Sequence, residues 1–508
     1  MGTKRNLTVP IPVLGLDTSK PGEYIDNRAT PNCQNVIIDS STIRKRLGTS
    51  AMGSSLGERV LAFKEFYVGT TPYVARIGYT KLELLNQGTS TWSAKTGTAL
   101  TATGASVVGT AIPLLSGSRI LCFTNFTDNI RKFDGTNNSS DLIGAPPKAK
   151  FIIEYKDYLF IAYVLDGGVT YSMRVQWSDT GLVETWTGGN ASHTDLIQDG
   201  GDITGLGTFG NFLTVHKESS IYLGYPVSTS SVFEFDRRET GVGTINFATI
   251  QNLSIGEQIF LARDGIHIFN GSSAPLVAPE ISDEIRNGIN GEYIYKCWSC
   301  IAQEYDEYWV AIPMGSQTEP DTIYKYNYKT GQCYKDTASN ISTAGIYHAT
   351  TGQLTWADMT HSIQSDTTRW DDIIYAKLFP TIIFGSTAGV TTVKDNINND
   401  NAVAINAFWD SKDYLGDDVN ALSRWLELEV IAKGDTLNVS YSIDGGNSWN
   451  FIKTITLTAD YPTEFSPRIC YFDVVARKIR FRFGNNSLSE SFTLKQFTIK
   501  QVPREKIK

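Results

Sequence analysis

The segment Phe260-Leu261-Ala262-Arg263-Asp264-Gly265-Ile266-His267-Ile268-Phe269 decides the fold class. Two short runs rich in apolar side chains flank the dipeptide Asp264-Gly265, which is the composition of paired strands. Asp-Gly between such runs favours a type I′ turn, because both central residues of that turn need positive φ. The segment therefore predicts a β-hairpin with Asp264-Gly265 at its turn.

Runs of the same kind recur along the chain outside this hairpin. They are rich in β-branched and aromatic side chains and end at Gly, Asn or Asp, as at residues 73–77, 119–123, 158–163 and 211–215. Helical periodicity is confined to residues 279–289, where isoleucines recur every four residues and Ser282 is a candidate cap. We therefore expect an all-β chain with at most one short helix.

These strands group into units of similar length. The units span residues 58–102, 103–147, 148–200, 201–243, 244–290, 291–340 and 341–400. A four-stranded propeller blade takes roughly 40–50 residues, and radial repetition leaves only short, protected sheet edges. We therefore expect a β-propeller of about seven blades, a count that the missing WD40 signature leaves open.

From residue 401 onwards the strands are longer and alternate strictly, as at residues 425–430, 437–441 and 479–483. Strict alternation is typical of an antiparallel sandwich in which each sheet has one buried and one solvent-exposed face. The polar stretch from Asp395 to Asn401 marks the boundary. The expected organisation is an N-terminal arm (1–57), a β-propeller (58–400) and a C-terminal antiparallel β-sandwich (401–508).

Composition excludes several classes of protein. The 508 residues carry a formal net charge of −8, divided as +3 in residues 1–57, −12 in 58–400 and +1 in 401–508. An acidic surface does not hold phosphates, which disfavours an ordinary nucleic-acid binder. No apolar run approaches the roughly 18 residues that span a bilayer, no secretory leader is recognisable, and six dispersed cysteines suggest reduced thiols. We expect a chain that is made and used without export.

Three matches to enzyme motifs fail in their context. The dinucleotide fingerprint at residues 205–210 is followed by a strand-like run where a helix is needed. The nucleophile elbow at residues 53–57 lies in a linker of small residues. Cys297-Trp298-Ser299-Cys300 lacks a second pair of zinc ligands and the helix start of a redox site. We therefore predict no catalytic residue, no metal, no cofactor and no enzymatic activity.

A more specific match is the Asp-box Ser442-Ile443-Asp444-Gly445-Gly446-Asn447-Ser448-Trp449. In such a hairpin Asp444 bonds turn amides after Ser442, Gly446 takes positive φ and Trp449 packs beneath. The box resembles those of sialidases, but sialidases carry several boxes and an arginine triad. Only one box and no triad can be identified here, so we interpret it as a structural turn.

One set of segments, taken in order along the chain, points to a family. The set comprises residues 31–39, 42–48, 174–181, 184–186, 201–206, 215–222 and 261–266, and it ends with Phe408-Trp409-Asp410-Ser411-Lys412-Asp413-Tyr414 before the sandwich. Together these segments resemble the propeller-bearing nozzle or tail-accessory (stabilisation) proteins of tailed bacteriophages. Leu47 departs from the proline that is frequent in related proteins, and the chain is shorter than many of them.

The resemblance implies a structural virion protein that is synthesised in the host cytoplasm. Such proteins form a ring, typically a hexamer, that contacts portal or adaptor and fibre or spike proteins and surrounds or closes the DNA channel. An acidic wall would let DNA pass without specific binding. Arg44, Lys45 and Arg46, and the basic end at residues 504–508, would then meet acidic neighbours.

Two alternatives remain open at this point. The Asp-box and ten tryptophans also fit a glycan-binding or sialidase-like propeller. A cytosolic propeller scaffold that binds other proteins fits the same composition.

Overall fold

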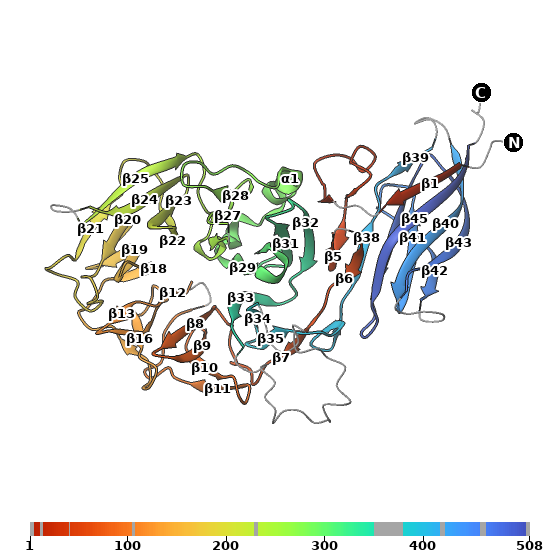
Figure 1. Ribbon diagram of the computed structural model, residues 1–508. Coiled ribbons are helices and arrows are strands. Elements are labelled where there is room, and N and C mark those ends of the chain that lie inside the picture. Colours follow the sequence, from red (N-terminus) through yellow and green to blue (C-terminus); the bar gives the residue numbers. More distant parts are fainter. Residues whose placement is uncertain are drawn as a thin grey trace.

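The computed structural model describes residues 5–10, 14–39, 41–103, 107–227, 232–253, 255–349, 379–416, 422–457 and 464–503. Figure 1 shows its strands arranged as a ring of radial sheets beside a separate sandwich. The expected fold class, an all-β propeller with a C-terminal antiparallel sandwich, is confirmed.

The first four blades follow one another along the chain as antiparallel sheets of four strands. The first blade contains β8 (Ala62–Val68), β9 (Thr71–Ile77), β10 (Leu82–Asn86) and β11 (Thr91–Ala94). The second contains β12 (Gly109–Ala111), β15 (Leu121–Thr124), β16 (Arg131–Phe133) and β17 (Ser140–Asp141), and the hairpin of β13 (Leu114–Leu115) and β14 (Ser118–Arg119) interrupts it. The third contains β18 (Lys148–Tyr155), β19 (Tyr158–Asp166), β20 (Val169–Trp177) and β21 (Ser192–Asp195). The fourth contains β22 (Ile203–Phe209), β23 (Phe212–Lys217), β24 (Ser220–Pro226) and β25 (Phe233–Thr240).

The remaining blades depart from the four-strand pattern. The fifth has β26 (Gln251–Asn252), β27 (Gln258–Ala262) and β28 (Gly265–Phe269), and it leads into α1 (Pro279–Gly288). The sixth has β29 (Trp298–Ala302), β30 (Glu307–Ile312), β31 (Thr322–Asn327) and β32 (Cys333–Thr337), with β2 (Gly15–Leu16) and β3 (Ala29–Thr30) added at its outer edge. The seventh has β33 (Ile341–Tyr347), β34 (Thr381–Ser386) and β35 (Thr391–Lys394). Short 3-10 helices η1 (Phe247–Thr249), η2 (Gly291–Lys296) and η3 (Gln303–Tyr305) lie between strands. The described residues therefore form seven blades.

An N-terminal strand closes the ring. β7 (Thr49–Ala51) pairs antiparallel with β35, with Ala51 opposite Thr392 and Thr49 opposite Lys394. β36 (Asn399–Asp400) and β37 (Val403–Ala404) extend the same sheet. Blade seven therefore combines the start and the end of the propeller, which ties the two ends of the ring together.

Aromatic side chains fill the space between neighbouring blades. Between the third and fourth blades the ring of Phe233 lies 4.9 Å from Phe160 and 5.3 Å from Trp177, centroid to centroid and edge to face. These side chains are at most 2% exposed. Edge-to-face pairs at this spacing add to the stabilisation that burial alone gives.

The sandwich contains two sheets. One has β43 (Ser466–Ala476), β40 (Ser423–Gly434), β45 (Phe492–Pro503), β6 (Ile43–Lys45), β5 (Val36–Ile38) and β1 (Arg5–Pro10). The other has β4 (Cys33–Gln34), β38 (Ala407–Asp410), β44 (Lys478–Asn485), β41 (Thr436–Ser442), β42 (Asn450–Thr456) and β39 (Tyr414–Leu415). Trp425, Phe481, Phe483 and Phe497 are almost fully buried between them.

The N-terminal residues do not form a separate arm. Within residues 5–57, β1, β4, β5 and β6 belong to the sandwich, β2 and β3 extend blade six, and β7 closes blade seven. In Figure 1 this red segment runs between the propeller and the sandwich. The strands are short, and all of them except β3 and β5 have a partner hundreds of residues away, so the local sequence pattern did not reveal the pairing.

Two local expectations need adjustment. The hairpin of β27 and β28 is present, but Ala262 pairs with Gly265, so the turn residues are Arg263 and Asp264. Asp264 Oδ1 lies 2.9 Å from His267 Nε2, and Gly265, with φ +142°, begins the second strand. The expected helix is α1, but its N-cap residue is Ala278, and the Ser282 hydroxyl donates to the Asp264 carbonyl instead.

Candidate functional site

Two ion pairs with buried carboxylates lie within the sandwich, where they hold the end of β38 and the residues after it against β44. Arg480 donates from Nε and Nη2 to Asp413 at 2.8 and 3.0 Å, and Arg482 donates to Asp410 at 2.7 and 2.8 Å. The two carboxylates are 2% and 1% exposed. Burial raises the pKa of Asp410, although the Arg482 guanidinium opposes that change. Alternate residues of β44 place both arginines on one face of the sheet.

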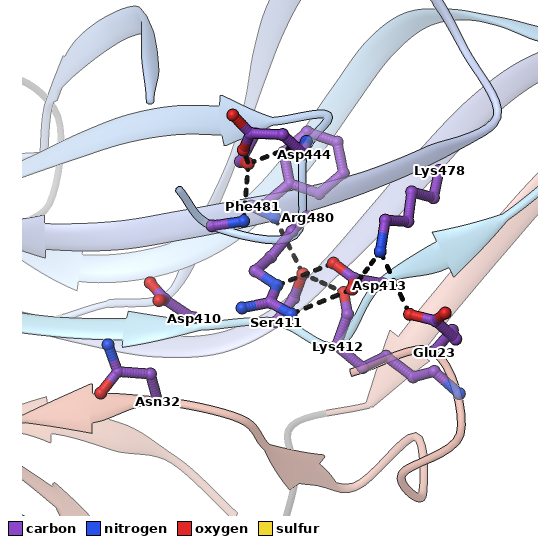
Figure 2. Close-up of polar contacts among 12 residues, drawn as sticks. Glu23, Asn32, Asp410, Ser411, Lys412, Asp413, Asp444, Lys478, Arg480 and Phe481 are labelled. Carbon is purple, nitrogen blue, oxygen red and sulfur yellow. Dashed lines mark hydrogen bonds and ion pairs between the residues drawn. The ribbon is translucent and has the colours of Figure 1, made fainter. Parts of the chain in front are cut away.

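Lys478 continues this row and connects it to the N-terminal segment. Its Nζ lies 3.3 Å from Asp413 Oδ2 and 3.2 Å from Glu23 Oε2. The Asp413 amide donates to the Gly22 carbonyl at 3.0 Å, and Lys412 Nζ donates to the Ile25 carbonyl at 3.0 Å. Figure 2 shows Asp413 between Arg480 and Lys478, with Glu23 on the far side of the lysine. The segment 408–414, which carried part of the phage resemblance, thus anchors residues 22–25.

The Asp-box is an ordered turn at the end of β41. Ser442 donates to Asp444 Oδ1 at 2.7 Å and accepts from the Gly446 amide at 2.8 Å, while the Ser448 amide donates to Asp444 Oδ1 at 3.0 Å. The Ser442 and Ser448 hydrogen bonds hold the pKa of the Asp444 carboxyl well below its usual range. Gly446 has φ +97°, a value that favours glycine.

Trp449 links this turn to the ion pairs. The Arg482 guanidinium carbon lies 4.1 Å from the centre of the Trp449 ring and 3.9 Å from that of Phe408. A guanidinium between two aromatic faces is stabilised electrostatically as well as by packing. Asp444 is exposed and its contacts are to its own turn, so this geometry is that of a structural turn.

The basic run at residues 44–46 is largely internal. Lys45 is 3% exposed and donates from Nζ to the carbonyls of Ser487 and Glu490, and its burial lowers its pKa to about 8. Arg46 donates to Asp400 at 2.6 and 2.9 Å. Arg44 is partly exposed. Lys45 and Arg46 are therefore occupied within the chain and are not free to meet an acidic neighbour, which corrects the expectation from sequence. Residues 504–508 lie outside the described residues.

Asn35 connects the two domains through its side chain. Its Nδ2 donates to Thr337 Oγ1 at 3.0 Å and to the Asn406 carbonyl at 2.9 Å, and its Oδ1 accepts from Arg46 Nε at 3.0 Å. Its backbone has φ +55°, which asparagine tolerates better than most residues. Asn35 lies within the segment 31–39, but no sequence pattern assigned it a role. An asparagine in a short turn between strands is the signal that was available.

An interdomain cavity of about 680 Å³ lies between blades six and seven, residues 34–49 and residues 400–406. Glu307 in its wall accepts from Trp309 Nε1 at 2.7 Å and from the Tyr334 hydroxyl. Burial raises the pKa of Glu307. Asp336 pairs through Oδ2 with Lys325, whereas its Oδ1 has no hydrogen-bond partner among the described residues.

The wall of the interdomain cavity is chemically varied. Lys325 Nζ lies 3.9 Å from the centre of the Trp309 ring, and Arg46 Nε lies 3.4 Å from Asp336 Oδ2. The arrangement can accept a hydrogen bond from a ligand at Asp336 and can pack an apolar face against Phe384. Sequence reasoning missed Glu307, Lys325 and Asp336, because single charged residues inside apolar strands carry no motif.

The rejected enzyme motifs lie in ordinary structure. The glycine motif at residues 205–210 spans β22 and its turn into β23, and the Ser55 hydroxyl donates to the Ala388 carbonyl at 3.0 Å. Cys297 and Cys300 are buried, and burial raises the pKa of the Cys300 thiol to about 12. Among the residues that the structure describes, no group of three or more His, Cys, Asp or Glu could hold a metal ion, and no helix is long and apolar enough to cross a membrane.

Comparisons with known proteins show no family. No protein-family model matches the chain, and no curated protein matches its sequence. Similar solved structures include the extracellular domain of a putative hybrid two-component system from B. thetaiotaomicron, with 9% identity, TM-score 0.42, and coverage of 90% of this chain and 62% of that one. BamB from Moraxella catarrhalis has 9% identity, TM-score 0.33, and coverage of 77% and 97%. An exo-β-1,3-galactanase from Phanerochaete chrysosporium has 11% identity, TM-score 0.28, and coverage of 89% and 100%. Similarity at this level says nothing about activity, and the fold assignment rests on the sheets described above.

Proposed function

We propose that this chain is a non-enzymatic structural subunit of a tailed-bacteriophage tail, working in a homo-oligomeric ring around the DNA channel. The observation that carries the proposal is a set of exposed apolar side chains on the edge strands of the two sandwich sheets. Phe451 on β42 and Ile469 and Tyr471 on β43 are 63%, 41% and 74% exposed. We call these three side chains the sandwich edge.

The sandwich edge has the features of an assembly surface. In the described structure β43 pairs only with β40, and β42 pairs only with β41, so both are edge strands. β43 is eleven residues long. Long edge strands with exposed apolar side chains invite pairing with another chain, and soluble proteins usually protect them. A neighbouring subunit would supply that protection.

The junction between the domains supports the same proposal. The two domains share the N-terminal strands, and the Lys478–Glu23 ion pair holds the sandwich to the segment between β2 and β3 of blade six. A ring subunit needs one rigid shape to close a ring. The proposed partners are other copies of this chain, portal or adaptor proteins, and fibre or spike proteins. The acidic propeller would let DNA pass without specific binding.

Electron microscopy and native mass spectrometry of the purified full chain test the proposal. Wild type should form closed rings, and the double variant I469K/Y471K should remain monomeric, because two buried charges without partners would oppose the contact. I197K, which alters a propeller residue that is 77% exposed, is the matched control and should still form rings. A wild-type chain that stays monomeric and never enters a virion would overturn the proposal.

A second candidate function is favoured by the interdomain cavity. Asp336 Oδ1 is a buried acceptor that no described residue pairs with, and Trp309 and Phe384 supply aromatic surface nearby. A few polar groups in a mainly apolar pocket are typical of small-ligand sites, and the set suits a neutral sugar. Binding to a glycan panel that Asp336→Asn abolishes would support this candidate. Failure of the folded wild type to bind any sugar would remove it.

A further inference from the structure

The innermost strands of the propeller enclose a central cavity of about 490 Å³. Residues of β8, β12, β18, β22, β26, β29 and β33 contribute to its wall. The charged residues among those described that line it are Arg59, Lys64 and Lys296, and none of its lining residues is a carboxylate. This composition is unexpected in a chain with a net charge of −8.

One carboxylate behind the wall compensates part of this charge. Glu319 binds Arg59 Nη1 through Oε2 and Lys296 Nζ through Oε1, the latter at 2.6 Å. Lys296 also donates to the Thr318 carbonyl at 2.8 Å and lies 4.9 Å from the centre of the Tyr293 ring. Arg59 and Lys296 therefore share one negative group and Lys64 has none, so the three positive groups exceed this carboxylate by two charges.

Lys64 is the cation without compensation. It is partly buried on β8, and among the residues that the structure describes, no hydrogen-bond acceptor or carboxylate pairs with its ammonium. Burial lowers its pKa, and no neighbouring charge opposes that change. Its neighbour Glu65 lies on the same strand but is bonded to His348, with Oε2 2.8 Å from the imidazole Nδ1. Burial of an unpaired ammonium costs free energy, and an apolar side chain would fill the same position at lower cost.

We infer that the central cavity binds a small anion, with a carboxylate or phosphate group that contacts Lys64 and lies close to Arg59 and Lys296. Such a group would accept hydrogen bonds from the Lys64 ammonium and neutralise the excess charge. Charge-assisted hydrogen bonds of this kind are the stronger class, and they gain strength where the walls exclude water. The inference concerns the propeller alone and does not depend on the assembly proposed above.

Titration calorimetry of the full chain with inorganic phosphate and with citrate tests the inference, and the two probes distinguish phosphate from carboxylate ligands. Wild type should bind at least one of them in a saturable way with one site per chain. Lys64→Met should weaken that binding by about tenfold or more, the value for losing one charge-assisted hydrogen bond. Lys64→Arg keeps the charge and should retain most of the affinity.

Lys453→Met is the matched control. Lys453 is an exposed lysine on β42 of the sandwich, and its substitution removes the same charge from the chain. It should bind the probe as wild type does. Thermal unfolding of each variant checks that the propeller is intact, and the bound anion should raise the melting temperature of wild type more than that of Lys64→Met. Absence of saturable binding in wild type, or equal binding by wild type and a folded Lys64→Met, would overturn the inference.

Discussion

His216 is a fully buried residue of β23, and its Nε2 lies 2.8 Å from Gln258 Oε1. Burial lowers the pKa of His216 to about 4, against about 6.5 in an unfolded chain. Between these values the unfolded state binds more protons, so the free energy of unfolding must fall as pH falls from 6.5 towards 4. The expected loss between about pH 7.5 and pH 5 is roughly 2 kcal/mol.

Urea unfolding at the two pH values measures this loss. His216→Gln should remove most of the difference, whatever its effect on stability at neutral pH. His193→Gln, which alters an exposed histidine on β21, is the matched control and should leave the difference in place. An unchanged pH dependence in His216→Gln would show that other groups cause it.

Asp413 is the acceptor of the buried junction and is 2% exposed. Asp413→Asn would leave Arg480 and Lys478 without their shared charge, and breaking a buried pair costs about 3–5 kcal/mol. Asp473→Asn breaks the exposed pair with Arg424 and should cost much less, because solvent screens that pair. Chemical denaturation of both variants measures the difference, and equal costs would contradict the importance of the junction.

At the residue scale the sequence predicts turns better than charges. The Asp-box specifies its own geometry, because Ser442, Asp444 and Gly446 lie within five positions and bond to one another. Lys45 and Arg46, in contrast, are held inside the chain by hydrogen bonds to residues distant in sequence. Their acceptors are Ser487, Glu490 and Asp400. A basic run therefore predicts side chains at the surface, whereas pairing with residues distant in sequence can bury those side chains.

Elements show the same division between local and distant information. Alternating apolar runs predicted most inner blade strands and the long strands of the sandwich, since burial of one face leaves a period of two in the sequence. The sequence pattern did not predict β7, because Thr49-Ser50-Ala51 has no apolar alternation and its partner β35 lies more than 300 positions away. Closure of the ring could not be predicted without knowing where the chain returns.

Gly48 directly precedes β7, and two backbone hydrogen bonds hold it in the seventh blade. Its amide donates to the Ile397 carbonyl at 2.7 Å, and its carbonyl accepts from the Asp395 amide at 3.0 Å. A Cβ added at Gly48 would lie 1.7 Å from the Asn399 carbonyl oxygen. Gly48→Ala must therefore displace backbone, and the expected loss of stability is about 3 kcal/mol.

Hydrogen exchange locates that loss. Amides of β7 and β35 should exchange faster in Gly48→Ala, while the sandwich strand β41 should change less. Gly291→Ala is the matched control, because a Cβ there meets nothing within 4 Å. Unchanged protection of β35 in Gly48→Ala would mean that β7 does not hold the ring closed.

At the scale of the whole molecule, the two domains are joined by more than a linker. Residues 5–57 supply strands to both, so the sandwich lacks part of both its sheets if they leave, and blade seven loses its closing strand. Domains joined by a simple linker usually unfold separately. Here, unfolding of either domain exposes surface of the other, and we expect one calorimetric transition for the wild-type chain.

Asn35→Ala tests what couples the domains. Asn35 bridges Thr337 on blade six and the Asn406 carbonyl beside the sandwich without itself lying in a strand. Alanine loses these hydrogen bonds and tolerates the positive φ poorly, at a combined cost of roughly 3–5 kcal/mol. Scanning calorimetry should then resolve two transitions. Asn35→Gly relieves the φ strain but restores no hydrogen bond, so two transitions in both variants assign the coupling to the side chain. One transition in both would instead assign it to the shared strands.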